Sequence, residues 1–268
     1  MTVDIGILGA DGRMGVAVIR AMAQVPRARL TAALTAPASD AIGQDAGALA
    51  GVGTLGVKLG SDLSTALDQC DVLIDFSAPK ASIDTALAMH NHRCKAMVSG
   101  TTGFTETENN ALEAASESIA LLRSGNFSPG VTALAALVEI ATEKLGTGWD
   151  IEILEMHHRY KVDAPSGTAL LLGEASAKGR GLAFEDAAVL SREGVTGERQ
   201  DDEIGFATLR GGGVVGRHEV RLASHLEMIT LGHDAFDRSV FARGAVDAAL
   251  WTHGKPKGLY NMRDVLGF

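Results

Sequence analysis

A short stretch of the sequence gathers several residues that can do chemistry: EMHHRYKVDAPSGTAL, at 155–170. It contains His157, His158 and Lys161 just ahead of a proline and a Ser-Gly-Thr triplet. A histidine can exchange a proton near neutral pH, and a lysine ammonium attracts anions. The stretch is therefore either a solvated basic turn or a pocket for an anion that also requires a proton.

Metal binding is a further alternative for the same stretch. Glu155, His157, His158 and Asp163 are ligand types, but their spacing matches no familiar metal site and no cysteine is near. We therefore predict no bound metal.

The residues that follow favour the anion pocket. Ser166 or Thr168 can cap a helix whose first turn lies near Pro165. The first N–H groups of that helix, at Gly167 and Thr168, could hold a carboxylate together with the two hydroxyls and the ammonium of Lys161. A histidine beside such a site can donate a proton.

The elements that must position these residues begin with a repeating pattern. Up to residue 128, apolar strand-like runs alternate with helical segments, which predicts βαβ crossovers and a parallel sheet. The expected strands cover 3–10, 28–35, 71–77, 95–103 and 119–127, and the expected helices cover 12–25, 63–70, 79–92 and 105–118.

The pattern changes after residue 128. A helix at 130–146 leads to a β run at 149–160, on which His157 and His158 would point to opposite faces. Long β runs then indicate a second domain of antiparallel or mixed sheet, and the glycines at 210–216 predict a hairpin turn. Further expected elements are a helix from about 166 to 178, β runs at 203–210, 214–224 and 225–235, and a helix at 238–255.

The first strand-to-helix junction carries Gly9, Gly12 and Gly15. Glycines there permit a tight turn and let backbone N–H groups approach a pyrophosphate at a helix N-terminus. A packing turn is the alternative, since the spacing GxxGxxG is a weak pattern by itself. Its position in an alternating α/β pattern favours dinucleotide binding.

The end of the second expected strand normally helps to select the cofactor. Here it reads Thr35-Ala36, with no acid until Asp40 to bind a ribose and no arginine to bind a 2′-phosphate. The choice between NADH and NADPH therefore stays open at this point.

Three other loops follow the carboxyl ends of expected strands, where ligands of open parallel sheets bind. They are Phe76–Ser77, the Gly-Thr-Thr-Gly sequence at 100–103 and the Ser-Gly-Asn-Phe-Ser sequence at 124–128. Together these loops favour a dinucleotide site.

The composition limits the partners and the compartment. The 268 residues carry 33 acids against 24 bases, a formal charge of −9, which argues against a general nucleic-acid or anionic-membrane surface. Cys70 and Cys94 form no disulfide framework, no stretch has the length of a membrane span, and no signal peptide precedes the first strand. We expect a cytoplasmic protein.

The 155–170 motif closely resembles the signature of the 4-hydroxy-tetrahydrodipicolinate reductase (dihydrodipicolinate reductase) family of bacterial and plant lysine biosynthesis. The resemblance covers essentially the whole chain. Other matching motifs are GADGRMG at 9–15, DVLIDFSAP at 71–79, GTTGF at 100–104, NFSPGV at 126–131, IGFATLRGG at 204–212 and GLYNMRDVL at 258–266.

The resemblance implies a role for each matching residue. It implies that His157 is the general acid, that Lys161 binds and polarises the substrate, and that Phe241 lies near the nicotinamide. Implied substrate contacts are His158, Ser166, Gly167, Thr168 and Arg238. The full set of expected cofactor contacts is Gly9, Ala10, Asp11, Gly12, Arg13, Met14, Gly15, Thr35, Phe76, Ser77, Gly100, Thr101, Thr102, Ser124, Gly125, Asn126, Phe127 and Phe241.

The chain departs from the family pattern at two places that bear on the cofactor. Thr35 and Ala36 stand where the family often has an acidic and then a basic residue, and Ala78 stands where it often has an arginine. Neither departure touches the 155–170 motif.

The resemblance also implies the overall plan. A Rossmann domain at 1–128, rejoined by 239–268, would bind NADH or NADPH, and a mixed α/β domain at 129–238 would bind a small dicarboxylate and assemble a homotetramer. Two rivals are another nicotinamide dehydrogenase with a catalytic cysteine and a dinucleotide-sensing regulator. Cys70 and Cys94 lie outside the second domain, and no DNA-binding segment is evident, so both rivals are disfavoured.

Overall fold

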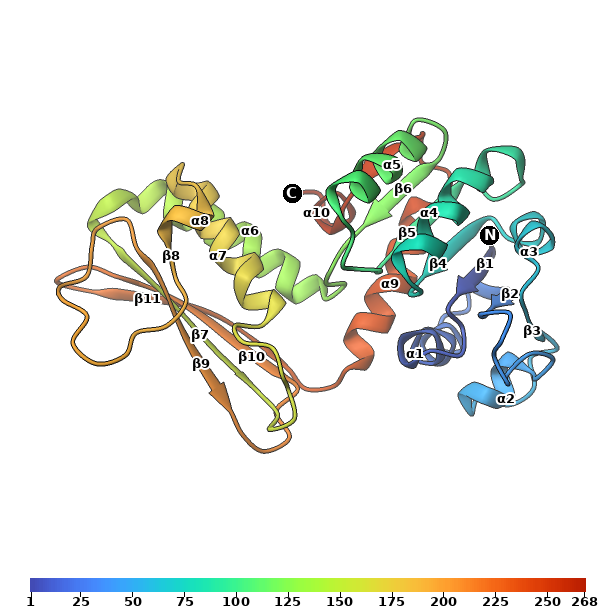
Figure 1. The fold of residues 1–268 in the computed structure, drawn as a ribbon, viewed down its shortest axis with the longest axis horizontal. Coiled ribbons are helices and arrows are strands. Elements are labelled where there is room, and N and C mark those ends of the chain that lie inside the picture. The colour runs from blue at the N-terminus through green and yellow to red at the C-terminus, as the bar shows by residue number, and fades with distance from the viewer. The chain divides into compact units, whose positions relative to one another are not determined.

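A computed structural model describes residues 1–268. The chain forms two compact units (Figure 1). The first contains residues 1–127 and 239–267, and the second contains residues 128–238.

The first unit is built on a seven-stranded sheet in which every pairing is parallel. Its order follows the Rossmann pattern 3-2-1-4-5-6, with β12 added beside β6. The expected parallel sheet is therefore confirmed. In spatial order the strands are β12 (Gly258–Tyr260), β6 (Ala120–Arg123), β5 (Ala96–Ser99), β4 (Val72–Asp75), β1 (Val3–Leu8), β2 (Ala28–Leu34) and β3 (Leu59–Gly60).

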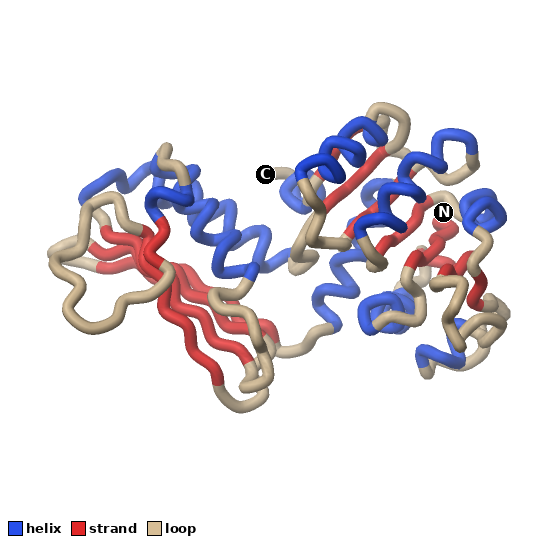
Figure 2. The backbone as a smooth tube through the Cα atoms, in the orientation of Figure 1, coloured by secondary structure: helices blue, strands red, loops and turns tan.

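Helices cover both faces of this sheet, as Figure 2 shows. Strand β4 illustrates why: Val72 and Ile74 join the core under α1 and α9, while Leu73 joins the core under α3, α4 and α5. Alternate side chains of one strand thus enter two cores, as in other buried parallel sheets. The helices are α1 (Arg13–Met22), α2 (Ala46–Ala50), α3 (Leu63–Gln69), α4 (Pro79–Ala88), α5 (Glu106–Ser116), α9 (Ser239–Thr252) and α10 (Met262–Leu266), with a 3₁₀ turn at Met89–Asn91.

The second unit is a five-stranded mixed sheet. Strand β10 runs antiparallel to both of its neighbours, whereas β7, β9 and β8 run parallel to one another. The expected mixed α/β domain is confirmed. The spatial order is β11 (Met228–Ala235), β10 (Gly216–Ala223), β7 (Asp150–His157), β9 (Ile204–Arg210) and β8 (Ala188–Val189), and the helices are α6 (Pro129–Leu145), α7 (Gly167–Arg180) and α8 (Phe184–Ala187), with a 3₁₀ turn at Gly146–Gly148.

The central strand β7 has one face turned toward the helices. Ile151 and Ile153 are buried there in a core shared with α6 and α7. Because strand side chains alternate, Glu155 and His157 continue the same face and are buried as well. The strand thus carries two titratable groups along its covered face to its carboxyl end.

The predicted hairpin at 210–216 is wrong. Strands β9 and β10 do not pair, because β7 lies between them and bonds to both. The glycine-rich connection instead crosses the end of β7, where the N–H of Gly211 donates to the His157 carbonyl (3.0 Å) and the N–H of Arg159 donates to the Gly212 carbonyl (3.2 Å). This crossing brings Arg210 beside the end of β7.

Other differences from the sequence expectation are local. The β run expected to continue to residue 160 ends at His157, and two segments read as loops contain α2, β3, α8 and β8. None of the helices combines the length and apolar character that a membrane span requires.

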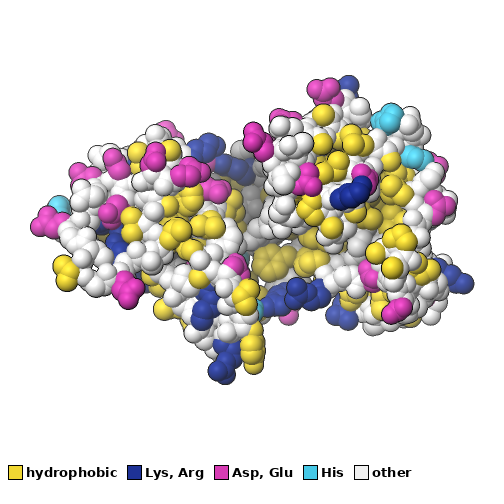
Figure 3. All heavy atoms as spheres, viewed as in Figure 1, with side chains coloured by type: hydrophobic (Ala, Val, Ile, Leu, Met, Phe, Trp, Pro, Cys, Tyr) yellow, Lys and Arg dark blue, Asp and Glu magenta, His cyan; other side chains and the backbone are white.

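Acidic side chains are dispersed over the face of the molecule that Figure 3 shows. Figure 3 shows Asp and Glu scattered over the face in view, with no single acidic field. On a chain of formal charge −9, a local cluster of cations can still select a small anion, because nearby charges dominate in a cleft.

Candidate functional site

The glycine loop between β1 and α1 is shaped by close backbone contacts. Gly9 has φ +81°, and a Cβ there would lie 2.6 Å from the Phe76 carbonyl oxygen. A Cβ at Gly15 would lie 2.7 Å from the Cα of Ala10, so this position also requires glycine. Gly12 is the N-cap of α1 and provides no side-chain cap. The first N–H groups of α1 therefore suit a phosphate of a dinucleotide.

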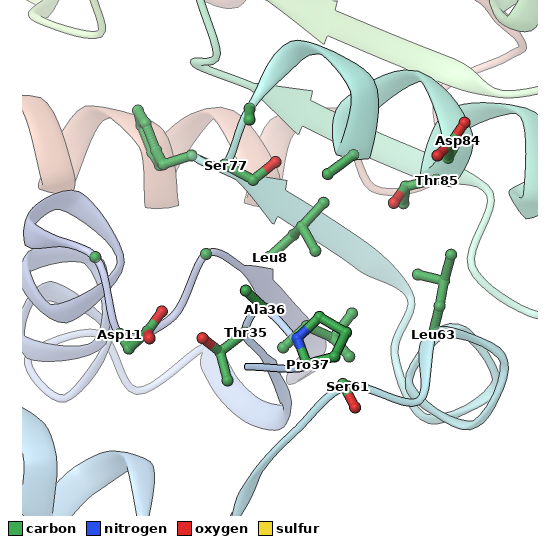
Figure 4. Close-up of a pocket in the computed structure, with 16 residues that line it drawn as sticks. Leu8, Asp11, Thr35, Ala36, Pro37, Ser61, Leu63, Ser77, Asp84 and Thr85 are labelled. Atoms are coloured by element: carbon green, nitrogen blue, oxygen red, sulfur yellow. The ribbon is translucent and has the colours of Figure 1, made fainter. Parts of the chain in front are cut away.

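A cavity of about 510 Å³ opens beside this loop (Figure 4). It brings together six of the expected cofactor residues, from the ends of β1, β2 and β4. It also includes residues that the sequence analysis missed, from the segments after β2 and β3, from the start of α3 and from α4. The expected residues are Gly9, Asp11, Gly12, Thr35, Phe76 and Ser77, and those missed include Pro37, Ser61, Leu63, Ala81, Asp84 and Thr85.

The polar groups of this cavity are acids and hydroxyls. Figure 4 shows Asp11 next to Thr35 at one end, and Asp84 with Thr85 on α4 at the other. The Ser39 hydroxyl donates to Asp11 Oδ2 at 2.6 Å, and this hydrogen bond lowers the pKa of Asp11 below 3.8. No lysine or arginine lines the cavity.

A fully buried carboxylate, Asp75, holds the neighbouring loops in place. Its Oδ1 accepts from the backbone N–H (3.0 Å) and the hydroxyl (2.5 Å) of Ser77. Its Oδ2 accepts from the hydroxyls of Ser99 (2.7 Å) and Thr101 (2.9 Å). One side chain therefore ties the loop after β4 to the loop after β5, and both loops carry expected cofactor contacts.

A second cavity, of about 340 Å³, lies at the ends of β5 and β6. It gathers four expected cofactor contacts, Thr101, Thr102, Ser124 and Gly125. Arg123, which the sequence analysis did not single out, also lines it. Its guanidinium lies 4.9 Å from the centroid of the Phe104 ring and donates to Asn109 Oδ1 at 2.7 Å.

The remaining expected cofactor residues line neither cavity. Ala10, Gly15 and Phe127 are buried, and the Phe127 ring packs against Phe76 with centroids 5.6 Å apart. Their contribution to the site is packing or backbone geometry. The others are Arg13, Met14, Gly100, Asn126 and, on α9, Phe241.

In the second unit, His157 is paired with a buried carboxylate. Its Nδ1 lies 2.6 Å from Glu155 Oε2, and Glu155 is 1% exposed. Arg210 donates to both Glu155 oxygens at 2.8 Å in a bidentate pair. Such geometry is the strong form of an ion pair. The Nε2 of His157 has no hydrogen-bond partner within the chain.

Burial and charge act in opposite directions on this pair. Burial raises the pKa of Glu155, but the hydrogen bonds from Arg210 and His157 outweigh it and hold that pKa below 4.5. Burial lowers the pKa of His157 below 6.5, although Glu155 favours the protonated ring. Glu155 is therefore ionised at neutral pH.

A second histidine, His218 on β10, packs beside His157 with ring centroids 5.1 Å apart. Its Nε2 lies 3.1 Å from the Ser166 hydroxyl, and its Nδ1 is buried without a partner. Burial, and secondly the charge of His157, lower the pKa of His218 to about 4. The ring is therefore neutral at physiological pH.

The predicted helix start is present at the expected place. Ser166 is the N-cap of α7, and its hydroxyl accepts from the N–H of Ala169 at 3.2 Å. Because Ser166 is buried and also bonded to His218, its side chain is occupied by the fold. The N–H of Gly167 has no acceptor within the chain, so it is available to an anion.

The basic residues of the motif are partly paired within the chain. Lys161 Nζ lies 2.8 Å from both oxygens of Asp163. Arg238 Nη2 lies 2.8 Å from His158 Nε2, and the backbone N of Tyr160 lies 3.2 Å from His158 Nδ1. The lysine and arginines of this cluster are Lys161, Arg210 and Arg238.

The four candidate metal ligands do not converge. Glu155 and His157 bond to each other, whereas Asp163 bonds to Lys161 and His158 to Arg238. No group of three or more His, Cys, Asp and Glu side chains is arranged to hold a metal ion.

Two residues of this cluster escaped the sequence analysis. Arg210 lies in the IGFATLRGG motif, and His218 follows the glycine-rich connection, but neither had an expected role. Their positions depend on β9 and β10 flanking β7, which the predicted hairpin obscured.

Comparisons with known proteins give one consistent result. The family model for "Dihydrodipicolinate reductase, N-terminus" matches residues 3–127, and that for "Dihydrodipicolinate reductase, C-terminus" matches residues 130–266. The chain is 50% identical over 262 residues to a 4-hydroxy-tetrahydrodipicolinate reductase of Allorhizobium ampelinum, covering 97% of each chain. It is 51% identical to 4-hydroxy-tetrahydrodipicolinate reductase 1 of Mesorhizobium japonicum, covering 97% of this chain and 96% of that one.

The fold also matches a solved structure. A dipicolinate-bound dihydrodipicolinate reductase from Paenisporosarcina sp. TG-14 aligns with a TM-score of 0.76 at 21% identity, over 97% of this chain and 98% of that one.

The substitution Asp75→Asn tests whether the buried carboxylate positions the cofactor loops. An amide cannot accept all four hydrogen bonds, so the loops after β4 and β5 should loosen. We expect the Kd for NADH, measured by fluorescence titration, to rise by about 10-fold.

Asp71→Asn is the matched control for that substitution. Asp71 precedes the same strand at its other end, where it pairs with Arg93 at 2.7 Å. It should change the free energy of unfolding without changing NADH affinity. If Asp75→Asn lowers stability but leaves the Kd of NADH unchanged, Asp75 has no positioning role.

The buried His218 should make the protein sensitive to acid. The unfolded chain takes up a proton near pH 6.5, whereas folded His218 does so only near pH 4, so stability falls as pH falls between these values. The expected loss between pH 7 and pH 4.5 is roughly 2.5 kcal/mol, measured by urea unfolding. His218→Gln should flatten this dependence, and His225→Gln, at an exposed position, should not. Equal slopes in all three proteins would contradict the assignment.

Proposed function

Because the chain belongs to the dihydrodipicolinate reductase family, we propose that it reduces 4-hydroxy-tetrahydrodipicolinate to tetrahydrodipicolinate with NADH or NADPH. The chain is an oxidoreductase, and its family belongs to lysine and diaminopimelate biosynthesis. One observation carries the proposal for the site. His157 offers a free Nε2 beside a helix start and a lysine, which suits protonation of a bound dicarboxylate.

The carboxylates of the substrate are held by groups of the second unit. One carboxylate accepts from the N–H groups at the start of α7, at Gly167 and Thr168, where the helix dipole also favours an anion. Lys161 exchanges its contact with Asp163 for one with the substrate and polarises the substrate ring. Arg238 supplies a further cation. His158 orients Arg238, and Ser166 shapes the turn as the helix cap.

The proton comes from His157. The six-membered ring of the substrate loses its hydroxyl group as water. A reduced nicotinamide, when bound, supplies a hydride to C4 of this ring. His157 then gives its Nε2 proton to the adjacent carbon. The balanced change consumes one NAD(P)H, one proton and the hydroxylated ring, and it yields NAD(P)⁺, water and the reduced ring.

We further propose that NADH is the preferred cofactor. The glycine loop and the cavity at the ends of β1, β2 and β4 suit a dinucleotide, with the adenosine ribose near Asp11 and Thr35. Asp11 is ionised, and no lysine or arginine lines this cavity. Asp84 also lines it and pairs with Lys80, which lies outside the lining, at 2.7 Å. A 2′-phosphate would meet negative charge there without a partner, whereas a ribose hydroxyl could donate to Asp11.

A coupled assay tests the activity and the cofactor preference together. Freshly generated 4-hydroxy-tetrahydrodipicolinate is mixed with the purified protein, and the loss of absorbance is followed with NADH and NADPH separately. We expect substrate-dependent oxidation with a higher kcat/KM for NADH. Folded protein that oxidises neither cofactor would overturn the proposed activity, and a higher kcat/KM for NADPH would overturn the preference alone.

The same assay examines the proton donor. His157→Ala should lower kcat by roughly 10²- to 10⁴-fold, the usual contribution of a general acid. His225→Ala, at an exposed position, serves as the control. Near-normal turnover of His157→Ala would remove His157 from the mechanism.

We also propose a cytoplasmic homotetramer assembled through the sheets of the second units. Helices α6 and α7 cover one face of this sheet, whereas residues of the other face, such as Leu209 (48% exposed) and Met228 (58% exposed), are open in the single chain. Burying such side chains against other copies is favourable. Light scattering should give four times the 27.8 kDa chain mass. A monomer at micromolar concentration would contradict this assembly.

A further inference from the structure

Glu155 accepts from four donor atoms, which come from three different elements of the second unit. Besides His157 Nδ1 at 2.6 Å and the two Arg210 nitrogens at 2.8 Å, its Oε1 accepts from the backbone N–H of Ser166 at 3.1 Å. A buried carboxylate with this many donors is held in a single orientation. Because it is ionised, it can only accept hydrogen bonds.

This acceptor decides which nitrogen of His157 exchanges its proton. Nδ1 must carry hydrogen in order to donate to Glu155, in both the neutral and the charged ring. The proton that His157 gains and loses is therefore on Nε2, the nitrogen without a partner in the chain.

The same carboxylate connects the histidine to the anion-binding helix start. Ser166, which donates its N–H to Glu155, is the N-cap of α7. Arg210 binds Glu155 and also donates to the backbone carbonyl of Asp163 at 2.7 Å, within the loop that carries Lys161. A shift of Glu155 would thus move the proton donor and the carboxylate-binding groups together.

We propose that Glu155, clamped by Arg210, is a positioning residue that fixes the Nδ1–H of His157, presents Nε2 as the proton donor and sets its distance from the start of α7. This inference rests on the proposed function, in which His157 protonates the substrate.

The charged groups around His157 define how it should titrate. Glu155 on the same strand favours the protonated ring, whereas Lys161 from the following loop and Arg210 from β9 disfavour it. The fourth titratable neighbour, His218 on β10, is neutral above about pH 4 and contributes little charge. Removing Glu155 should lower the pKa of His157, and removing Arg210 should raise it.

The decisive measurement is the pH profile of kcat for Glu155→Gln and Arg210→Gln. The acid must be protonated, so kcat falls on the basic side as His157 loses its proton. Glu155→Gln should move this fall to lower pH by about one unit, and Arg210→Gln should move it to higher pH. A merely structural role would reduce kcat equally at every pH. Shifts in the same direction, or no shift in either variant, would overturn the proposal.

Glu152→Gln is the matched control. Glu152 lies on the same strand and is likewise paired with arginine, in its case Arg192 and Arg199, but it contacts neither His157 nor α7. Its pH profile should coincide with that of the unaltered protein. A shift equal to that of Glu155→Gln would mean that any loss of charge on β7 has this effect, and would overturn the specific role of Glu155.

A second readout needs no turnover and observes the histidine in the unaltered protein. In the unaltered protein with ¹⁵N-labelled histidine, imidazole shifts report which nitrogen carries hydrogen, and the spectrum of His157→Gln assigns the signal. We expect the Nδ1–H form for neutral His157. The Nε2–H form would overturn the proposal.

The two ideas can fail separately. If His157→Gln keeps its turnover and still shows the fall of kcat at high pH, the proposed proton donor is wrong. The imidazole spectrum of the unaltered protein still reports whether Glu155 orients the His157 ring. If His157→Gln loses turnover but Glu155→Gln does not change the pH at which kcat falls on the basic side, the proposed function survives and the positioning role does not.

Discussion

The arrangement of the second unit depends on stabilising one buried negative charge. A carboxylate as inaccessible as that of Glu155 is costly unless donors surround it, and here the donors come from β7, β9 and the start of α7. Satisfying this charge therefore determines where those three elements meet. His157, the helix cap Ser166 and Arg210 are brought together by the same requirement.

The first unit uses a comparable device for a different purpose. Asp75 is also buried and also accepts four hydrogen bonds, but its donors are hydroxyls and a backbone N–H from two loops. Because these donors are neutral, the Asp75 side chain organises the geometry of the two loops through hydrogen bonds alone. The acids and hydroxyls that line the cavity beside the glycine loop suit a cofactor whose ribose donates hydroxyl protons. The cations around His157 instead suit an anionic substrate.

Local signals in the sequence predicted the parts of the structure that depend on neighbouring residues. The alternation of strands and helices predicted the parallel sheet, the glycines predicted the turn after β1, and Ser166 is the expected kind of helix cap. The hairpin at 210–216 failed because a glycine-rich turn between two β runs says nothing about a third strand lying between them. Strand order is a long-range property, and Arg210 and His218 could be placed only once it was known.

The sequence by itself supplied the residue types for the proposed chemistry, since the motif at 155–170 and the glycine loop hold histidines, cations and a glycine turn within short segments. Only the tertiary structure decided the state of those groups. Glu155 meets Arg210 across 55 positions of sequence, and Ser166 meets His218 across 52, because β9 and β10 flank β7. Burial and hydrogen-bond partners set protonation and orientation, and both follow from how distant segments pack.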